Sequence, residues 1–156
     1  MGTGMSDQAA SHQLRIGRFT CPGQIYLVTT DTRQRAPIFQ DFKLGRLLVQ
    51  ELKRAEEQGL VTSLAWVVMP NHLHWLFELK TGTLQRLLQQ IKARSSIAIN
   101  RHRARSEPVW QQGYHDKALR AEDDLVKFAR YTINNPVRAG LVQRVADYSL
   151  WDAVWV

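Results

Sequence analysis

The hydrophobic pattern of the chain is sharpest between Val67 and Leu79, where it has the two-residue period of a strand. One set of alternate positions is wholly apolar and predicts a face turned toward the core: Leu73, Trp75, Phe77 and Leu79. His72 and His74 lie between them and therefore share the opposite face. Burying two imidazoles without partners costs free energy. They are either hydrogen-bonded within the fold or ligands of a metal ion, and the spacing alone leaves both open.

Two further segments have the composition of strands. Residues 24–30 are rich in β-branched and aromatic side chains, and residues 60–69 alternate between apolar and polar positions. Only Pro70 and Asn71 separate the second segment from the strand at 72–79. Such a short connection predicts an antiparallel hairpin.

Two segments have the 3.6-residue period of amphipathic helices. The first follows Asp41, a favourable N-cap, and runs to about Gln58, before Gly59. Its apolar stripe consists of Leu44, Leu47, Leu48, Leu52 and Ala55. The second helix follows Thr83. Its buried side comprises Leu84, Leu87, Leu88, Ile91, Ser95 and Ala98.

A final helix is predicted from about Ala121 to Asn135, because Pro136 follows. Before it, residues 109–111 and 117–119 form short extended pieces. The order of elements is then strand, helix, hairpin, helix, short strand and helix. This order predicts a ferredoxin-like α+β fold, an antiparallel β-sheet with helices packed on one face.

The composition favours a single globular domain. The 156 residues are 44% hydrophobic, which is enough to build a core. We assign residues 14–156 to this domain and expect the polar residues 1–13 to be a disordered lead. The single cysteine, Cys21, excludes an internal disulfide and a cysteine-based zinc cluster and favours the cytoplasm. We expect no membrane association, since no apolar run approaches the roughly 20 residues that span a bilayer and the N-terminus lacks a signal-peptide pattern.

The charge indicates a polyanionic partner. Lys and Arg number 21 against 14 Asp and Glu, a net charge of +7. Nucleic acid is the commonest such partner, and a membrane surface fits less well because the basic residues do not gather on one amphipathic helix. Solubility alone also explains some excess charge.

The final predicted helix carries two polar groups at the edge of its apolar arc. Tyr131 and Asn135 lie one turn apart, so a helix packed on the sheet would hold both near the sheet surface. A Mg²⁺ or Mn²⁺ ion held by two imidazoles and an amide oxygen would polarise a phosphodiester for attack by the phenol. Tyr26, Tyr114 and Tyr148 are competing phenols, and Tyr114 is the strongest because its surroundings are polar. Taken alone, however, an aromatic residue near the end of an amphipathic helix usually serves packing, and an asparagine before a proline commonly ends a helix.

Three motifs in sequence order resemble those of a known family. They span residues 66–74, 110–116 and 131–142, the last of which contains Asn-Pro-Val-Arg-Ala-Gly. Together they resemble the REP-associated tyrosine transposases, relatives of the single-tyrosine HUH transposases, over roughly residues 14–151. Gly113 departs from the family pattern, in which a bulkier or basic residue is usual, and this puts the DNA contacts at that position in doubt.

The resemblance implies a role for each candidate residue. His72 and His74 match the two metal-binding histidines, Asn135 matches the polar third ligand, and Tyr131 matches the nucleophile. On this basis Tyr114 is not the nucleophile.

The resemblance also implies an activity. Members of the family use Mg²⁺ or Mn²⁺ to cleave single-stranded DNA beside imperfect palindromic hairpins, called REP or BIME elements. Cleavage leaves a 5′-phosphotyrosine and a free 3′-OH, and the strands can be rejoined. The implied protein is bacterial, nucleoid-associated when bound to DNA, and a monomer or homodimer. The main alternative is a non-catalytic DNA- or RNA-hairpin-binding protein of the same fold. An unrelated metalloenzyme for small molecules fits the charge poorly.

Clustered arginines are predicted to neutralise hairpin phosphates. They are Arg15, Arg18, Arg94, Arg101, Arg103 and Arg105. The alternative for these residues is a solvated run of charge.

Overall fold

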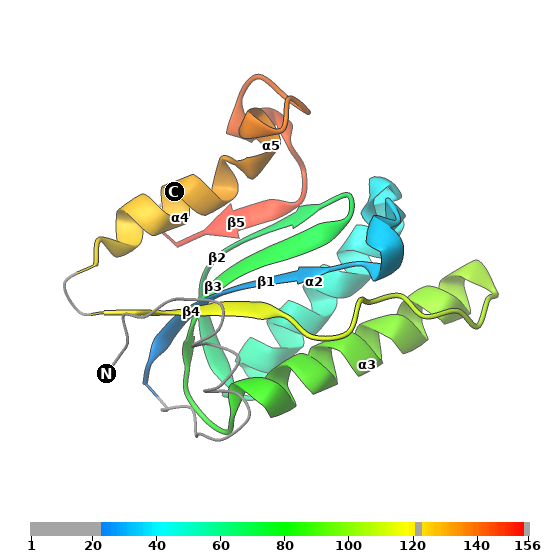
Figure 1. Cartoon of the computed structure of the whole chain (residues 1–156), viewed down its shortest axis with the longest axis horizontal. Coiled ribbons are helices and arrows are strands. Elements are labelled where there is room, and N and C mark those ends of the chain that lie inside the picture. The colour runs from blue at the N-terminus through cyan, green and yellow to red at the C-terminus, as the bar shows by residue number, and fades with distance from the viewer. Residues whose placement is uncertain (1–22, 121–122, 155–156) are drawn as a thin grey trace.

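The structure is a computed structural model that describes residues 23–120 and 123–154 (Figure 1). The expected lead, residues 1–13, lies outside the described residues, as do Arg15, Arg18 and Cys21. The described chain forms an antiparallel five-stranded sheet with packed helices. The predicted α+β, ferredoxin-like class is confirmed.

The sheet has the strand order β4-β1-β3-β2-β5. Its strands are β1 (Ile25–Asp31), β2 (Val61–Met69), β3 (His72–Leu79), β4 (His115–Leu119) and β5 (Trp151–Ala153). All neighbouring strands are antiparallel. The predicted hairpin is formed by β2 and β3, and its last pair places Met69 opposite His72.

The short strands differ in part from the prediction. The extended piece at 117–119 belongs to β4, which begins earlier, at His115. Residues 109–111 contain no strand, and Trp110 makes an isolated bridge with Thr32. Strand β5 was not predicted, because three residues are too few to show a period.

The remaining elements are helices. They are α2 (Phe42–Glu57), α3 (Leu84–Arg103), α4 (Leu125–Ile133) and α5 (Asn135–Arg138), with three 3₁₀ turns at Arg33–Arg35, Ile38–Gln40 and Val145–Asp147. Asp41 and Thr83 cap α2 and α3 as predicted, since their side chains accept hydrogen bonds from backbone amides. Gly59 follows α2 with a φ of 77°, the left-handed conformation that favours glycine after a helix. None of the helices in the described residues is long and apolar enough to cross a membrane.

Helices cover both faces of the sheet, whereas the sequence predicted them on one. The apolar residues of β3 that include Leu73 and Trp75 pack in one core cluster with α2 and α3. Leu76 packs on the other face with Ala129 and Ile133 of α4. Figure 1 shows α4 on the side of the sheet opposite α2 and α3. The expectation fails for α4 because the histidine face also carries apolar residues that need a cover.

The final helix is interrupted, which corrects its predicted extent. Asp124 caps α4 by accepting a hydrogen bond from the amide of Lys127, so the described helix begins later than Ala121. It ends at Ile133, and α5 begins after Asn134. Pro136 lies in the first turn of α5, where a backbone N–H is not needed. Tyr131 and Asn135 therefore belong to two successive helices.

Candidate active site

His72 and His74 lie side by side at the start of β3, on the face that α4 covers in part. Their ring centroids are 4.7 Å apart and the rings are almost perpendicular, at 88°. In the register with β1, His72 lies opposite Asp31 and His74 lies opposite Thr29. Directly opposed residues share a face of an antiparallel pair, so all four side chains meet on this surface.

Each imidazole is oriented by a hydrogen bond at Nδ1. His72 Nδ1 lies 2.7 Å from Asn71 Oδ1, and His74 Nδ1 lies 3.0 Å from Thr29 Oγ1. An amide oxygen only accepts, so His72 must donate from Nδ1, and a neutral ring then keeps its lone pair on Nε2. Contacts of this kind orient metal-binding histidines. The Nε2 atoms are the nitrogens through which the pair could bind a cation.

Both histidines are held in the neutral form at neutral pH. Burial, followed by the charges of His72 and Arg138, lowers the pKa of His74 to about 4. Burial and the charge of Arg35 lower the pKa of His72, and Asp31 offsets part of this effect. Neutral imidazole is the form that binds metal ions. At neutral pH the pair therefore carries no proton that a metal ion would have to displace.

Tyr131 differs from the other three tyrosines in its position. Its side chain is exposed, with 61% of its surface accessible, and it projects from α4. Tyr26, Tyr114 and Tyr148 instead pack with the core cluster that contains α2 and α3, and the Tyr148 hydroxyl donates to the Val68 carbonyl at 2.6 Å. Tyr131 is thus the phenol on the helix that covers the histidine face.

Arg138 was missed in the sequence, although it lies beside Tyr131. The Cζ atom of Arg138 is 3.6 Å from the centroid of the Tyr131 ring. The break at Asn134 redirects the chain so that α5 brings Arg138 back over the tyrosine. Arg138 also acts electrostatically on His74. Reading the segment as one helix ending at Asn135 gave no signal for this contact.

Asn135 is half-buried at the first position of α5. Its amide nitrogen donates to the Thr132 carbonyl at 2.9 Å, which leaves Oδ1 as the atom that could face a cation. Among the described residues, no three His, Cys, Asp or Glu side chains gather into a metal-binding group. Two neutral imidazoles and an amide oxygen fit a divalent cation whose other positions are filled by water or substrate.

Helix α3, which carries Arg94, Arg101 and Arg103, lies on the other side of the sheet (Figure 1), and Arg105 follows it in the chain. Arg94 Nε is 3.0 Å from the buried carboxylate of Glu51 in α2. Arg103 is half-buried and donates to Asn100 Oδ1 at 3.4 Å, whereas Arg101 is exposed. Arg105 lies 3.8 Å from Glu107. The structure does not bring this group together with the histidines.

Gly113 lies in the irregular segment before β4 and has a φ of 86°. A residue with a side chain would be strained in this conformation. The departure from the family pattern therefore suits the local backbone of this chain.

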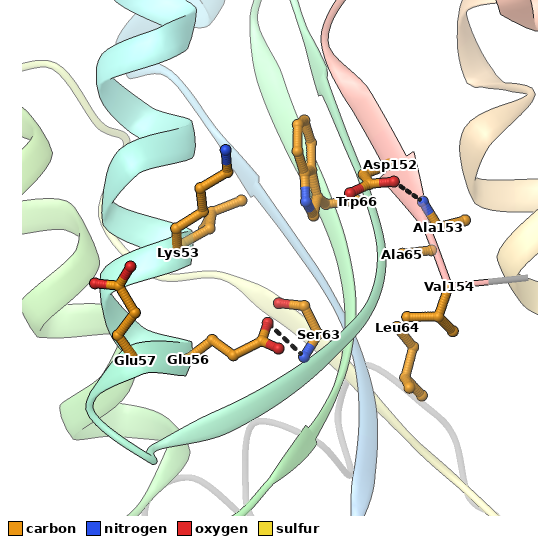
Figure 2. A pocket seen from close by; sticks show the side chains of 11 residues that line it. Lys53, Glu56, Glu57, Ser63, Leu64, Ala65, Trp66, Asp152, Ala153 and Val154 are labelled. Carbon is orange, nitrogen blue, oxygen red and sulfur yellow. Dashed lines mark hydrogen bonds between the residues drawn. The ribbon is translucent and has the colours of Figure 1, made fainter. Parts of the chain in front are cut away.

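A separate cleft of about 390 Å³ lies between α2 and the β2–β5 edge. Figure 2 shows Lys53, Glu56 and Glu57 on its helical side, and Asp152 on its strand side. Three carboxylates against one lysine would repel a phosphate backbone. This cleft is a poor binding site for DNA.

Comparison with known proteins identifies the family. The sequence matches the model of the family described as "Transposase IS200 like" over residues 23–135, more than half of the chain. The chain belongs to this family. The matched segment of the IS200-like transposase contains His72, His74, Tyr131 and Asn135 and ends before Arg138.

Individual relatives agree with this assignment. The chain is 29% identical to the REP-associated tyrosine transposase of Escherichia coli (strain K12) over 135 residues, or 84% of this chain and 77% of the relative. It has the fold of a REP-associated tyrosine transposase solved bound to a REP hairpin, with a TM-score of 0.72 and 23% identity over 86% of this chain and 79% of that one. A candidate transposase of Deinococcus radiodurans R1 has a TM-score of 0.54 and 18% identity, over 76% of this chain and 95% of that one. The resemblance predicted from the sequence is confirmed.

Proposed function

We propose that this IS200-like transposase cleaves single-stranded DNA beside a REP-type hairpin, with Tyr131 as nucleophile and His72, His74 and Asn135 as metal ligands. The main support for the proposal is the position of Tyr131. Among four tyrosines it is the exposed phenol on the helix that covers the histidine face, while the others pack on the opposite side of the sheet. A solved protein of the same fold is described as bound to a REP hairpin, which supports a hairpin as the substrate.

The proposed reaction is a transesterification. The Tyr131 oxygen attacks phosphorus, the phenolic proton passes to solvent, and a P–O(Tyr) bond forms. The P–O3′ bond breaks with its electron pair on O3′, which takes up a proton and leaves as a free 3′-OH. The product is a 5′-phosphotyrosine, and attack by a 3′-OH reverses the step and rejoins strands. The reaction consumes no oxidant and no nucleotide.

The protein supplies orientation and charge to this reaction. A bound Mg²⁺ or Mn²⁺ would polarise the phosphodiester and offset the negative charge of the transition state. His72 and His74 would hold it through Nε2, because Nδ1 of each ring is engaged with Asn71 or Thr29. We infer that the protein acts on chromosomal DNA in the bacterial cytoplasm, and that it does so as a monomer or homodimer.

The test is formation of a covalent protein–DNA adduct. The protein is incubated with Mn²⁺ and labelled single-stranded oligonucleotides that carry REP-type hairpins, and the products are separated on a denaturing gel. We expect an adduct with the native protein and with Tyr114→Phe, and none with Tyr131→Phe. Both substitutions remove one hydroxyl, so each controls for the other.

Two results would contradict the proposal. An adduct that survives Tyr131→Phe and disappears in Tyr114→Phe would identify a different nucleophile. Tight hairpin binding without any adduct would favour the non-catalytic hairpin-binding function.

A further inference from the structure

Arg138 is stacked on the ring of the exposed Tyr131. The distance of 3.6 Å from Cζ to the ring centroid is that of direct contact between the guanidinium and the ring. Tyr131 remains 61% exposed, so the contact does not result from burial in a core. The backbone that carries Arg138 is held in α5, where the Arg138 amide donates to the Asn134 carbonyl at 3.0 Å.

The charge of Arg138 is not matched by a carboxylate within the described residues. Some arginines elsewhere in the fold pair with acidic groups, as Arg35 does with Asp31 and Arg144 with Asp147. The guanidinium of Arg138 instead packs on the ring of Tyr131, and its positive charge contributes to the lowered pKa of His74. A cation in this setting attracts an anion into the space next to the phenol and the histidines.

The guanidinium remains able to bind such an anion while it is stacked. Its five N–H donors lie in its plane and point outward from its edges, whereas the ring of Tyr131 covers a face. Phosphate oxygens bind guanidinium edges in pairs, and these charge-assisted hydrogen bonds are roughly twice as strong as neutral ones.

We propose that Arg138 binds the phosphate that Tyr131 attacks, and that its stacking on the ring orients the phenol toward the phosphorus atom. The inference rests on the proposed function and adds a phosphate-binding residue to it. One arginine then performs two tasks: it neutralises a non-bridging oxygen as charge develops in the transition state, and it limits the rotation of an exposed tyrosine.

The first test measures phosphate binding without catalysis. Inorganic phosphate is titrated into the metal-free protein while the side-chain Nε–H signals of its arginines are followed by NMR. We expect the Arg138 signal to shift in a saturable manner. Arg130 is the matched control, because it is an exposed arginine of α4. Equal, non-saturating shifts of both signals would overturn phosphate binding by Arg138.

The second test separates the reaction rate from DNA affinity. Single-turnover adduct formation is measured at saturating hairpin DNA, and hairpin affinity is measured in EDTA. We expect Arg138→Ala to lower the rate by about 100-fold or more, the typical effect of removing one donor to a transition-state oxygen. Hairpin affinity should change by less than about threefold, because most phosphate contacts lie elsewhere. Arg130→Ala should behave as the native protein.

Chemical rescue distinguishes phosphate binding from a structural role. Free guanidinium ion, added below denaturing concentrations, should restore part of the rate of Arg138→Ala and none of the rate of Tyr131→Phe. Arg138→Lys should recover less than the rescued protein, since an ammonium cannot form the planar stack or the paired hydrogen bonds. A purely structural arginine would show a lower unfolding midpoint in Arg138→Ala and no rescue.

The two hypotheses fail in different ways. If Arg138→Ala forms the adduct at the native rate, the role of Arg138 is overturned and the proposed function stands. If the native protein forms no adduct while phosphate still shifts the Arg138 signal, the proposed function is overturned and Arg138 remains an anion site.

Discussion

At the scale of single residues, the sequence left open whether the two histidines are hydrogen-bonded within the fold or bind a metal ion, and the structure is compatible with both uses at once. Each ring makes a hydrogen bond within the fold, through Asn71 for His72 and Thr29 for His74. These bonds occupy Nδ1 and leave Nε2 for a ligand. The sequence could not distinguish these uses, because Thr29 belongs to a strand that is distant in sequence and adjacent only in the sheet. A structural hydrogen bond and a metal site are compatible in one imidazole.

The low pKa of His74 predicts a pH-dependent stability. Its pKa is about 4 in the folded protein and near 6.5 when unfolded, so the unfolded state binds the proton more readily between these values. The free energy of unfolding should therefore rise with pH from about 4 to 6.5 and reach its full value above 6.5. The contribution of His74 is about 3 kcal/mol. Urea unfolding in EDTA at several pH values measures this dependence.

The matched variants for this prediction are His74→Gln and His102→Gln. His102 is exposed, so His102→Gln is the control for the loss of a histidine at the surface. His74→Gln should reduce the slope of the profile between pH 4 and 6.5, and the lowered pKa of His72 should leave part of the slope in place. Identical profiles for His74→Gln and the native protein would show that His74 titrates normally in the folded state.

At the scale of elements, α2 and α3 are joined by an ion pair around Glu51. This carboxylate is buried in α2 and accepts from Arg54 at 3.3 Å and from Arg94 of α3 at 3.0 Å. Arg94 was predicted from the sequence to bind DNA phosphates. The contact adds a structural role, because a buried carboxylate needs its partners.

Replacement of Arg94 should therefore affect stability as well as DNA binding. We expect Arg94→Ala to lower the free energy of unfolding by about 1.5–3 kcal/mol, the range for a hydrogen bond to a charged group. Arg101→Ala, on the exposed side of α3, should change it by less than about 0.5 kcal/mol. Urea denaturation at neutral pH compares the two variants. Equal free energies of unfolding for the two variants would mean that the Arg94–Glu51 ion pair does not contribute to stability.

Elements with a clear period were predictable from the sequence, and elements set by tertiary contacts were not. The strands at 24–30, 60–69 and 72–79 and the helices capped by Asp41 and Thr83 were all found. The side of the sheet covered by α4 was predicted wrongly, because periodicity identifies an apolar face without naming its partner. The candidate site follows the same rule. Its histidines, its tyrosine and Arg138 all belong to sequence motifs, but the contact of Arg138 with Tyr131 depends on the break between α4 and α5.

At the scale of the whole molecule, the two groups proposed to meet DNA lie on different sides of the sheet. Tyr131 and the histidines lie on the α4 side, whereas Arg101 extends from α3 on the other. Figure 1 shows the β2–β3 turn and the C-terminal end of α3 at the same end of the molecule. A hairpin bound at α3 would therefore pass its single strand around this end of the sheet to reach Tyr131. The acidic cleft beside β5 lies off this path and would repel the backbone.

This arrangement predicts which positive charges contribute to the salt dependence of hairpin binding. Contacts with phosphates release counterions, so the affinity for a REP-type hairpin should fall steeply as salt rises from about 50 to 200 mM. Arg101→Ala should reduce the slope of log affinity against log salt by about 1, because one phosphate contact is lost. Lys53→Ala is the matched control: Lys53 lines the acidic cleft, and its removal should leave the slope unchanged. Fluorescence anisotropy with a labelled hairpin in EDTA measures these slopes without cleavage. A hairpin affinity of the native protein that does not change with salt would contradict binding through phosphate contacts. Equal changes of slope in the two variants would contradict DNA binding along α3, because the affinity would then not depend on where the positive charge lies.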